Sequence, residues 1–174
     1  MERCLSPERE TLGEIARLQA EIDDDLASAA AHRDDIAELL DLEDAWSEGS
    51  PYLSKAAIAL HHYYCAVESC LERIVRTFEG MVSEGPDWHR ELLHVATLEI
   101  PQVRPPVLRA DTEAALSHLL RFRHFLRHAY SAKLQVDRMR ELAELLVHAS
   151  VEVDRDLTDF RDYLLRCQAA LSSP

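Results

Sequence analysis

The chain has 174 residues, of which 29% are charged and 47% are hydrophobic, and its formal net charge at pH 7 is −13. This length is enough to bury a core, and we expect residues 1–174 to form a single helical domain. The strong negative charge argues against nucleic-acid binding over the whole surface but leaves room for a local basic site. Without a signal sequence or an apolar segment long enough to span a bilayer, we expect a cytoplasmic protein with no membrane contact.

The composition predicts an all-α fold. Ala, Leu, Glu and Arg dominate, there are only four glycines, and no run of alternating β-branched residues occurs. Residues 1–48 are acidic and carry apolar residues at steps of three and four. This spacing predicts one long amphipathic helix, or a helix pair, that ends near Trp46.

The remaining two thirds of the chain predict one short and three long helices. Their expected ranges are about Ser54 to Glu79, ended by Gly80; about 88–98; Asp111 or Thr112 to about Tyr130; and Leu134 or Asp137 to Leu171. In the last helix we expect these residues in the core: Leu142, Leu145, Leu146, Val151, Val153, Leu157, Phe160, Leu164 and Leu165. Short connections between such helices favour an up-and-down bundle of four to five helices.

Charge is distributed unevenly along the chain. Residues 1–50 hold fifteen acids against four arginines, whereas residues 104–140 hold eight Lys or Arg residues against three acids. The densest basic stretch is residues 121–130, RFRHFLRHAY. Such asymmetry points to an anionic partner or to a self-complementary interface.

Two arginines of this stretch share a face with leucines. At 100° per residue, Arg123 and Arg127 project from the stripe formed by Leu116, Leu119, Leu120 and Leu126. A buried or interfacial guanidinium needs an anion, either a carboxylate or a phosphate. One interpretation is purely structural: Arg123 pairs with acids of the first helix, and His128 is an ordinary histidine at a helix end.

The other interpretation is a site, and it meets a geometric obstacle. On a regular helix Arg123 and His128 are offset by about 140° and by a rise of about 7.5 Å, so their side chains diverge. Convergence requires a kink or helix end near residues 127–128, or a second copy of the same helix across a two-fold axis.

Metal binding is disfavoured by the ligand count. A di-metal carboxylate bundle usually needs two Glu-x-x-His pairs, and the chain offers one, Glu91 with His94. His124 and His128 have the spacing of a zinc pair but no glutamate between them. We therefore expect no metal and no other cofactor.

Arg123 and His128-Ala129-Tyr130 form the pattern Arg-x4-His-x-Tyr, which resembles the motif of the HepT-like ribonuclease toxins of the HEPN superfamily. The resemblance covers about residues 50–165 and includes the segments ALHHYYCAVESCLERIVRTFEG, WHRELLHVA and RPPVLRADTEAALSHLLRFRHFLRHAY.

The resemblance implies a HEPN-like helical homodimer that cleaves RNA without a metal, as the toxin of a type VII-like toxin–antitoxin module. On this reading His128 is the general acid/base, Arg123 stabilises the phosphorane, and Arg121 and Arg127 hold flanking phosphates. Tyr130 matches the position at which a cognate MntA-like nucleotidyltransferase antitoxin attaches AMP. The alternative is a noncatalytic HepT-like dimeric binding or adaptor protein, which the net charge of −13 favours.

Overall fold

The computed structural model of the protein describes residues 7–80, 85–128 and 134–172, which form helices and connectors but no strand. The predicted all-α fold class is thereby confirmed. None of the helices in these ranges has the length and hydrophobicity that crossing a lipid bilayer requires. The elements are α1 (Pro7–Leu40), the 3-10 helix η1 (Glu43–Trp46), α2 (Pro51–Glu79), α3 (Trp88–Ala96), α4 (Ala110–His128) and α5 (Val136–Ser172).

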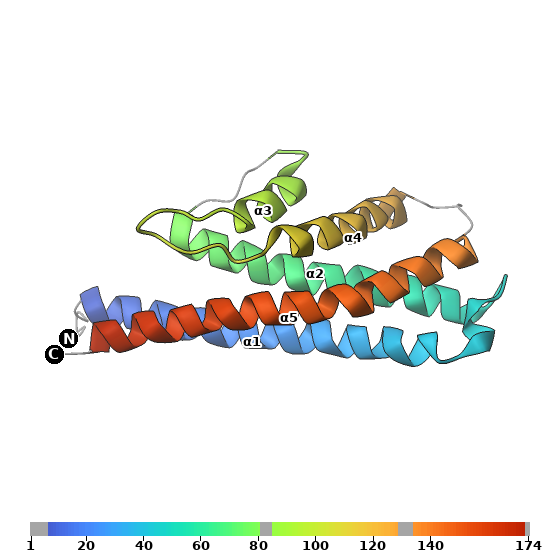
Figure 1. Cartoon of the computed structure of the whole chain (residues 1–174), viewed down its shortest axis with the longest axis horizontal. Helices are drawn as coiled ribbons and strands as arrows, with labels where there is room; N and C mark the ends of the chain where they lie inside the picture. Colours follow the sequence, from blue (N-terminus) through green and yellow to red (C-terminus); the bar gives the residue numbers. More distant parts are fainter. Residues whose placement is uncertain (1–6, 81–84, 129–133, 173–174) are drawn as a thin grey trace, which may run out of the picture.

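Three long helices lie side by side, and two shorter ones cover part of them. α1, α2 and α5 run along the long axis, while α3 and α4 lie against α2 on the side away from α1 (Figure 1). α1 begins and α5 ends at the same end of the molecule (Figure 1). α2 contacts every other helix, so residues that face different helices from α2 can meet in one core.

Local sequence fixes both ends of α2. Ser50 is the N-cap, and its hydroxyl accepts a hydrogen bond from the Tyr52 N–H at 3.3 Å, while Pro51 occupies the first turn without leaving a donor unused. At the other end Gly80 adopts φ 78° and donates to the carbonyl oxygen of Arg76 at 2.9 Å. A left-handed glycine of this kind ends a helix, as the sequence predicts at this position.

The connector between α3 and α4 is tied down by one buried arginine. The side chain of Arg104 donates to the Glu79 carboxylate at 2.9 Å and to the carbonyl oxygens of Val95 and Leu98 at 3.1 and 3.0 Å. These contacts give hydrogen-bond partners to backbone carbonyl groups at the end of α3 and in the irregular segment after it. The path of the chain from α3 to the start of α4 is therefore fixed.

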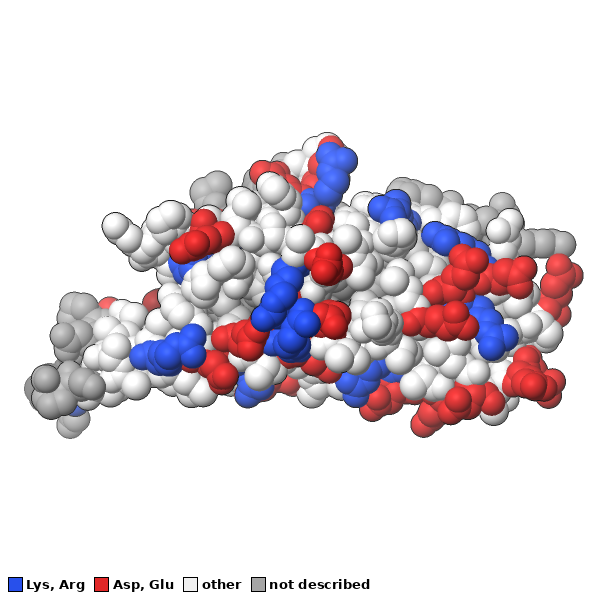
Figure 2. All heavy atoms as spheres, in the orientation of Figure 1, with Lys and Arg blue, Asp and Glu red and all other residues white. Residues whose placement is uncertain are grey.

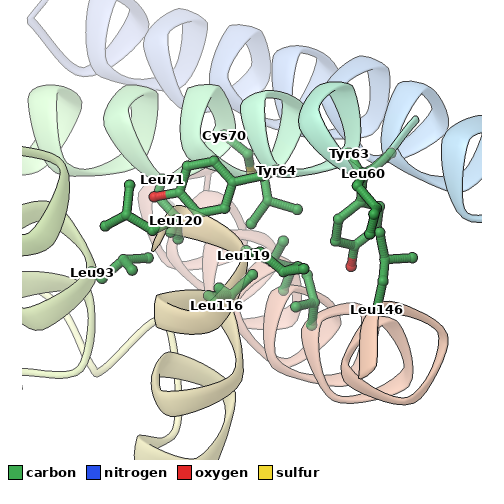
Figure 3. Close-up of a cluster of buried hydrophobic side chains, with 14 of the residues drawn as sticks. Leu60, Tyr63, Tyr64, Cys70, Leu71, Leu93, Leu116, Leu119, Leu120 and Leu146 are labelled. Atoms are coloured by element: carbon green, nitrogen blue, oxygen red, sulfur yellow. The ribbon is translucent and has the colours of Figure 1, made fainter. Parts of the chain in front are cut away.

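The core lies between α2 and its neighbours. Tyr63 and Tyr64 are only 2% and 1% exposed, and the Tyr64 ring lies between α2 and the leucines of α4 (Figure 3). The prediction that Val151 and Leu165 of α5 lie in the core is wrong, because these residues are 64% and 54% exposed. On a regular helix both positions lie off the stripe of buried residues that includes Leu146, so they face outward.

A buried aspartate of α5 completes the N-terminus of α4. Asp156 is 2% exposed and accepts hydrogen bonds from the Arg109 N–H at 2.9 Å and the Thr112 hydroxyl at 2.6 Å, and it also pairs with the Arg109 guanidinium. Burial alone would raise the pKa of Asp156, but the hydrogen bonds from Arg109, Thr112 and Arg155 outweigh it and lower that pKa. The sequence predicted a helix start at Asp111 or Thr112, whereas α4 starts at Ala110.

Replacing Asp156 by Ala should lower the free energy of unfolding by about 2 to 4 kcal/mol at pH 7, because the buried Thr112 hydroxyl and the part-buried Arg109 N–H lose their acceptor. Since the pKa of Asp156 is lowered in the folded state, its contribution is present above about pH 4 and is lost as the pH falls further. Urea unfolding at pH 7 and pH 3 measures both effects. Asp159, whose side chain is 58% exposed, also pairs with Arg109, and Asp159→Ala should cost at most about 1 kcal/mol. Equal losses in the two variants would contradict this account.

Candidate functional site

The second half of α4 carries the basic stretch. Its two arginines on the leucine side of the helix, Arg123 and Arg127, differ in their exposure to solvent. Arg123 is 9% exposed, which confirms that it projects into the core. Arg127 is exposed, so it is not buried in the core of the single chain. The last turn of α4 leaves the core, because Leu126 is only half-buried and Phe125 is 45% exposed.

Arg123 belongs to a buried network with Glu68 of α2 and His89 of α3. Its Nη2 lies 3.3 Å from Glu68 Oε2, and its Nη1 lies 3.0 Å from His89 Nε2. The same carboxylate contacts His89 through a short hydrogen bond, with Oε1 2.6 Å from Nδ1. Side chains from three helices thus form one closed ring of polar contacts, and this ring is largely shielded from solvent.

The anionic partner of Arg123 is therefore a carboxylate of α2. The structural interpretation of the sequence placed that partner in the first helix, which is wrong, because α1 packs on α2 and α5 and Arg123 faces the opposite side of α2. Glu68 lies on the same side of α2 as Tyr64, and the guanidinium carbon of Arg123 is 5.9 Å from the centre of the Tyr64 ring. Sequence reasoning missed Glu68, although an acid beside an apolar stripe is the same signal that identified Arg123.

The network does not use all the hydrogen-bonding capacity of Arg123. A guanidinium has five N–H donors, and the contacts to Glu68 and His89 involve only Nη1 and Nη2. Nε is buried and has no hydrogen-bond partner among the described residues. Arg123 is thus held in place, and one of its donors is buried without a partner among the described residues.

His89 is the second functional candidate that the sequence did not single out. It is 6% exposed, its ring lies 3.7 Å from that of Trp88, and the His124 ring meets it edge-on at 5.5 Å. Burial lowers the pKa of His89, Arg123 and His124 act in the same direction, and Glu68 opposes them. The net shift is downward, so His89 is neutral at pH 7.

Two exposed arginines lie on the same half of α4 as Arg123. Arg121 and Arg127 are exposed, and neither forms a hydrogen bond or an ion pair with another described residue. Half-buried His61 of α2 is close enough for both Arg123 and Arg127 to lower its pKa, after the larger effect of burial. Charged side chains of both signs alternate on the face in Figure 2, and acids gather at the end where η1 and the start of α5 lie (Figure 2).

Two predicted site residues cannot be placed in this geometry. α4 ends at His128, whose side chain lies outside the described part of the structure, and Tyr130 lies outside the described residues altogether. The structure therefore brings Arg123, Glu68 and His89 together and places Arg121 and Arg127 at the surface. In the ranges that it describes, no three His, Cys, Asp or Glu residues are grouped so that they could hold a metal ion.

A family model described as HepT-like protein matches residues 55–164, which is more than half of the chain. The chain belongs to the HepT-like family. No curated protein and no solved structure matches it. The matched range contains Glu68, His89 and Arg123, whereas α1 lies entirely outside it.

Replacing Arg123 by Ala should lower the free energy of unfolding by about 3 to 5 kcal/mol, because it leaves the Glu68 carboxylate buried without a counter-charge. The matched control is Arg127→Ala on the same helix, for which we expect a change within about 0.5 kcal/mol. Chemical denaturation at pH 7 measures both variants.

Adding Glu68→Gln to the Arg123→Ala variant should recover part of the loss, because an amide costs less to bury than an unpaired carboxylate. If the double variant is no more stable than Arg123→Ala, the buried charge is not the cause.

Proposed function

We propose that this HepT-like protein is the ribonuclease toxin of a type VII-like toxin–antitoxin module and that it acts as a homodimer. The observation that carries the proposal is the position of Arg123. Its guanidinium is held by two helices at a fixed place, and exposed, unpaired Arg121 and Arg127 lie in the same part of α4. A fixed cation beside exposed cations suits an RNA backbone.

The proposed reaction is metal-independent transesterification. The ribose 2′-oxygen attacks the adjacent phosphorus, the bond from phosphorus to the 5′-oxygen breaks, and the products are a 2′,3′-cyclic phosphate and a 5′-hydroxyl. His128 takes the proton of the 2′-hydroxyl or gives one to the leaving 5′-oxygen, since imidazole titrates near neutral pH. Arg123 stabilises the extra negative charge of the phosphorane, and Arg121 and Arg127 bind the phosphates on either side.

The helix geometry supports a homodimer. Arg123 and His128 are five residues apart on α4, and at 100° per residue they diverge by about 140°. A second copy of α4 across a two-fold axis brings the arginine of one protomer toward the histidine of the other. The two sites of the dimer are then equivalent, as an isologous interface requires.

The proposed antitoxin is an MntA-like nucleotidyltransferase that attaches AMP to Tyr130. The modification places a bulky group with a negative phosphate two residues beyond His128. Its charge repels the RNA backbone, and its bulk occupies the space beside the proposed site.

A second candidate is a noncatalytic HepT-like dimeric adaptor, and two observations favour it. The net charge of −13 slows the approach of RNA, and Glu68 already neutralises Arg123. On this reading the network of Arg123 serves only to join α2, α3 and α4.

Replacing His128 by Ala should abolish both the growth defect and the RNA degradation that the wild-type protein causes when it is expressed without its antitoxin. The matched control is His118→Ala, because His118 is an exposed histidine of the same helix. That control should remain as toxic as the wild type. Growth curves and total RNA give the readout. Toxicity that persists in His128→Ala contradicts its catalytic role, and wild-type protein without any effect on growth or RNA favours the adaptor.

Co-expression with the proposed nucleotidyltransferase antitoxin, in the presence of ATP, should add AMP to the tryptic peptide that spans residues 128–133. Mass spectrometry of the digest detects the shift, and the Tyr130→Phe variant should lack it. An adduct of the same mass on the Tyr130→Phe peptide would refute the assignment to Tyr130.

A further inference from the structure

We propose that a pocket between the second half of α4 and the start of α5 binds one nucleotide of a single-stranded RNA. Its base lies against the ring of Phe125, and the phosphates on either side of the base contact Arg121 and Arg138. This inference rests on the proposed function and deepens it, because it names a place where the substrate is held away from the bond that breaks.

The pocket lies on a different face of α4 from the network of Arg123. The last turns of α4 and the first turns of α5 lie at the same end of the molecule (Figure 1), and the pocket between them has a volume of about 500 Å³. Its lining includes Arg121, Phe122 and Phe125, which share one side of α4. Phe125 follows Arg123 by two residues, or about 200° around the helix, so the two side chains point in nearly opposite directions.

The lining of the pocket is apolar at its base and cationic at its edge. Phe122 and Met139 are only 7% and 2% exposed, whereas Arg121 and Arg138 are exposed. Among the described residues, the lining contains no Asp or Glu. A pocket of similar volume between α1 and α2, about 580 Å³, has three glutamates beside its three arginines, so its charges are balanced. The pocket between α4 and α5 therefore fits a ligand that combines an apolar part with negative charge.

The apolar part of this ligand is best explained as a nucleobase. Phe125 is 45% exposed, and the centre of its ring lies 6.3 Å from that of Phe122. Proteins that bind single-stranded RNA use aromatic rings of this kind, because every base can stack on them, and place cations beside the rings for the backbone. Gln135 on the α5 side of the pocket offers an acceptor and two donors, which match the edge of a base and have no use against an acyl chain.

The two arginines stand on opposite walls of the pocket and are available to phosphates. Arg121 belongs to α4 and has no ion-pair partner among the described residues, while Arg138 belongs to α5. Arg138 pairs with Glu141 at 2.9 Å, but the two side chains are 57% and 64% exposed. An exposed pair one helical turn apart contributes little free energy, so a phosphate can take the place of the Glu141 carboxylate.

The exposure of the pocket favours a nucleotide that belongs to a chain. Arg121, Phe125, Gln135 and Arg138 are all exposed, so the pocket is an open groove. A free small molecule is usually buried over most of its surface, which this groove does not allow. A nucleotide within a strand gains further attachment from its neighbours, which are held at the same time by other cations of α4.

Fluorescence anisotropy of the full chain with a short, labelled 2′-O-methyl RNA measures binding without cleavage, because the blocked 2′-oxygen cannot attack phosphorus. Phe125→Leu keeps an apolar side chain but removes the ring, and it should weaken binding about tenfold, whereas Phe125→Tyr should bind like the wild type. The matched control is Tyr52→Leu on α2, an aromatic residue that is 43% exposed and lies outside the pocket, and its affinity should not change. Equal affinities of Phe125→Leu and wild type, or no binding by the wild type, overturn the proposal.

The salt dependence of the same binding tests the phosphate contact of Arg138. Arg138→Gln should weaken binding and lower the slope of log affinity against log salt concentration by about 0.7, the value for one phosphate of a single strand. Arg140→Gln changes the net charge equally, and Arg140 is an exposed residue of the same helix outside the pocket. That control should keep the wild-type slope, and equal slopes in the two variants contradict the contact.

Two further measurements separate RNA from other occupants of the pocket. UMP or AMP that displaces the oligonucleotide at concentrations near the Kd of the oligonucleotide itself would show a site for free nucleotides. Light scattering in which Phe125→Leu turns a dimer into a monomer would show an interface between two copies of the chain. Either result overturns the proposal.

The same experiments distinguish this inference from the proposed function. Wild-type protein that binds the 2′-O-methyl RNA through Phe125 but does not cleave unmodified RNA supports the pocket and contradicts the ribonuclease. Wild-type protein that cleaves RNA while Phe125→Leu binds as tightly as Tyr52→Leu supports the ribonuclease and refutes the pocket.

Discussion

An arginine that is buried in a helical bundle must find an opposite charge, and here that requirement joins three helices. Glu68 of α2 supplies the charge, and His89 of α3 contacts the Glu68 carboxylate through Nδ1 while the Arg123 guanidinium lies against its ring. Helix packing alone leaves several orientations for a helix as short as α3, since apolar contacts are not directional. The hydrogen bond between His89 and Glu68 is directional, so it favours one orientation of α3 relative to α2.

The same ring sets the electrostatic character of the candidate site. Glu68 balances the charge of Arg123, so the buried part of the site is close to neutral and attracts a phosphate weakly by itself. Attraction has to come from the exposed Arg121 and Arg127, which have no carboxylate partner among the described residues. In the proposed function, orientation and attraction are assigned to different arginines of one helix, and a local anion site is then compatible with an acidic protein.

The sequence predicted the positions of the helices better than the side-chain contacts between them. Gly80 ends α2 as predicted because capping is local chemistry, whereas α2 starts at Pro51 and not at about Ser54. The burial of Arg123 follows from helical periodicity alone. The identity of its partner does not, because the distance between two helices depends on how the whole bundle packs. Arg127 shares the stripe of Arg123 on a helical wheel, yet it is exposed, since a wheel contains no information on where the neighbouring helices end.

Because Asp156 contacts the start of α4, the hydrogen bonding of this helix is completed only after a later part of the chain has been synthesised. The backbone N–H of Arg109 and the hydroxyl of Thr112 find their acceptor 47 and 44 residues further along the chain. During synthesis, α4 therefore emerges before the residue that completes its first turn. The helix that carries Arg123 reaches its final hydrogen bonding only after most of α5 has been translated, so an incomplete chain presents this helix without its N-terminal anchor.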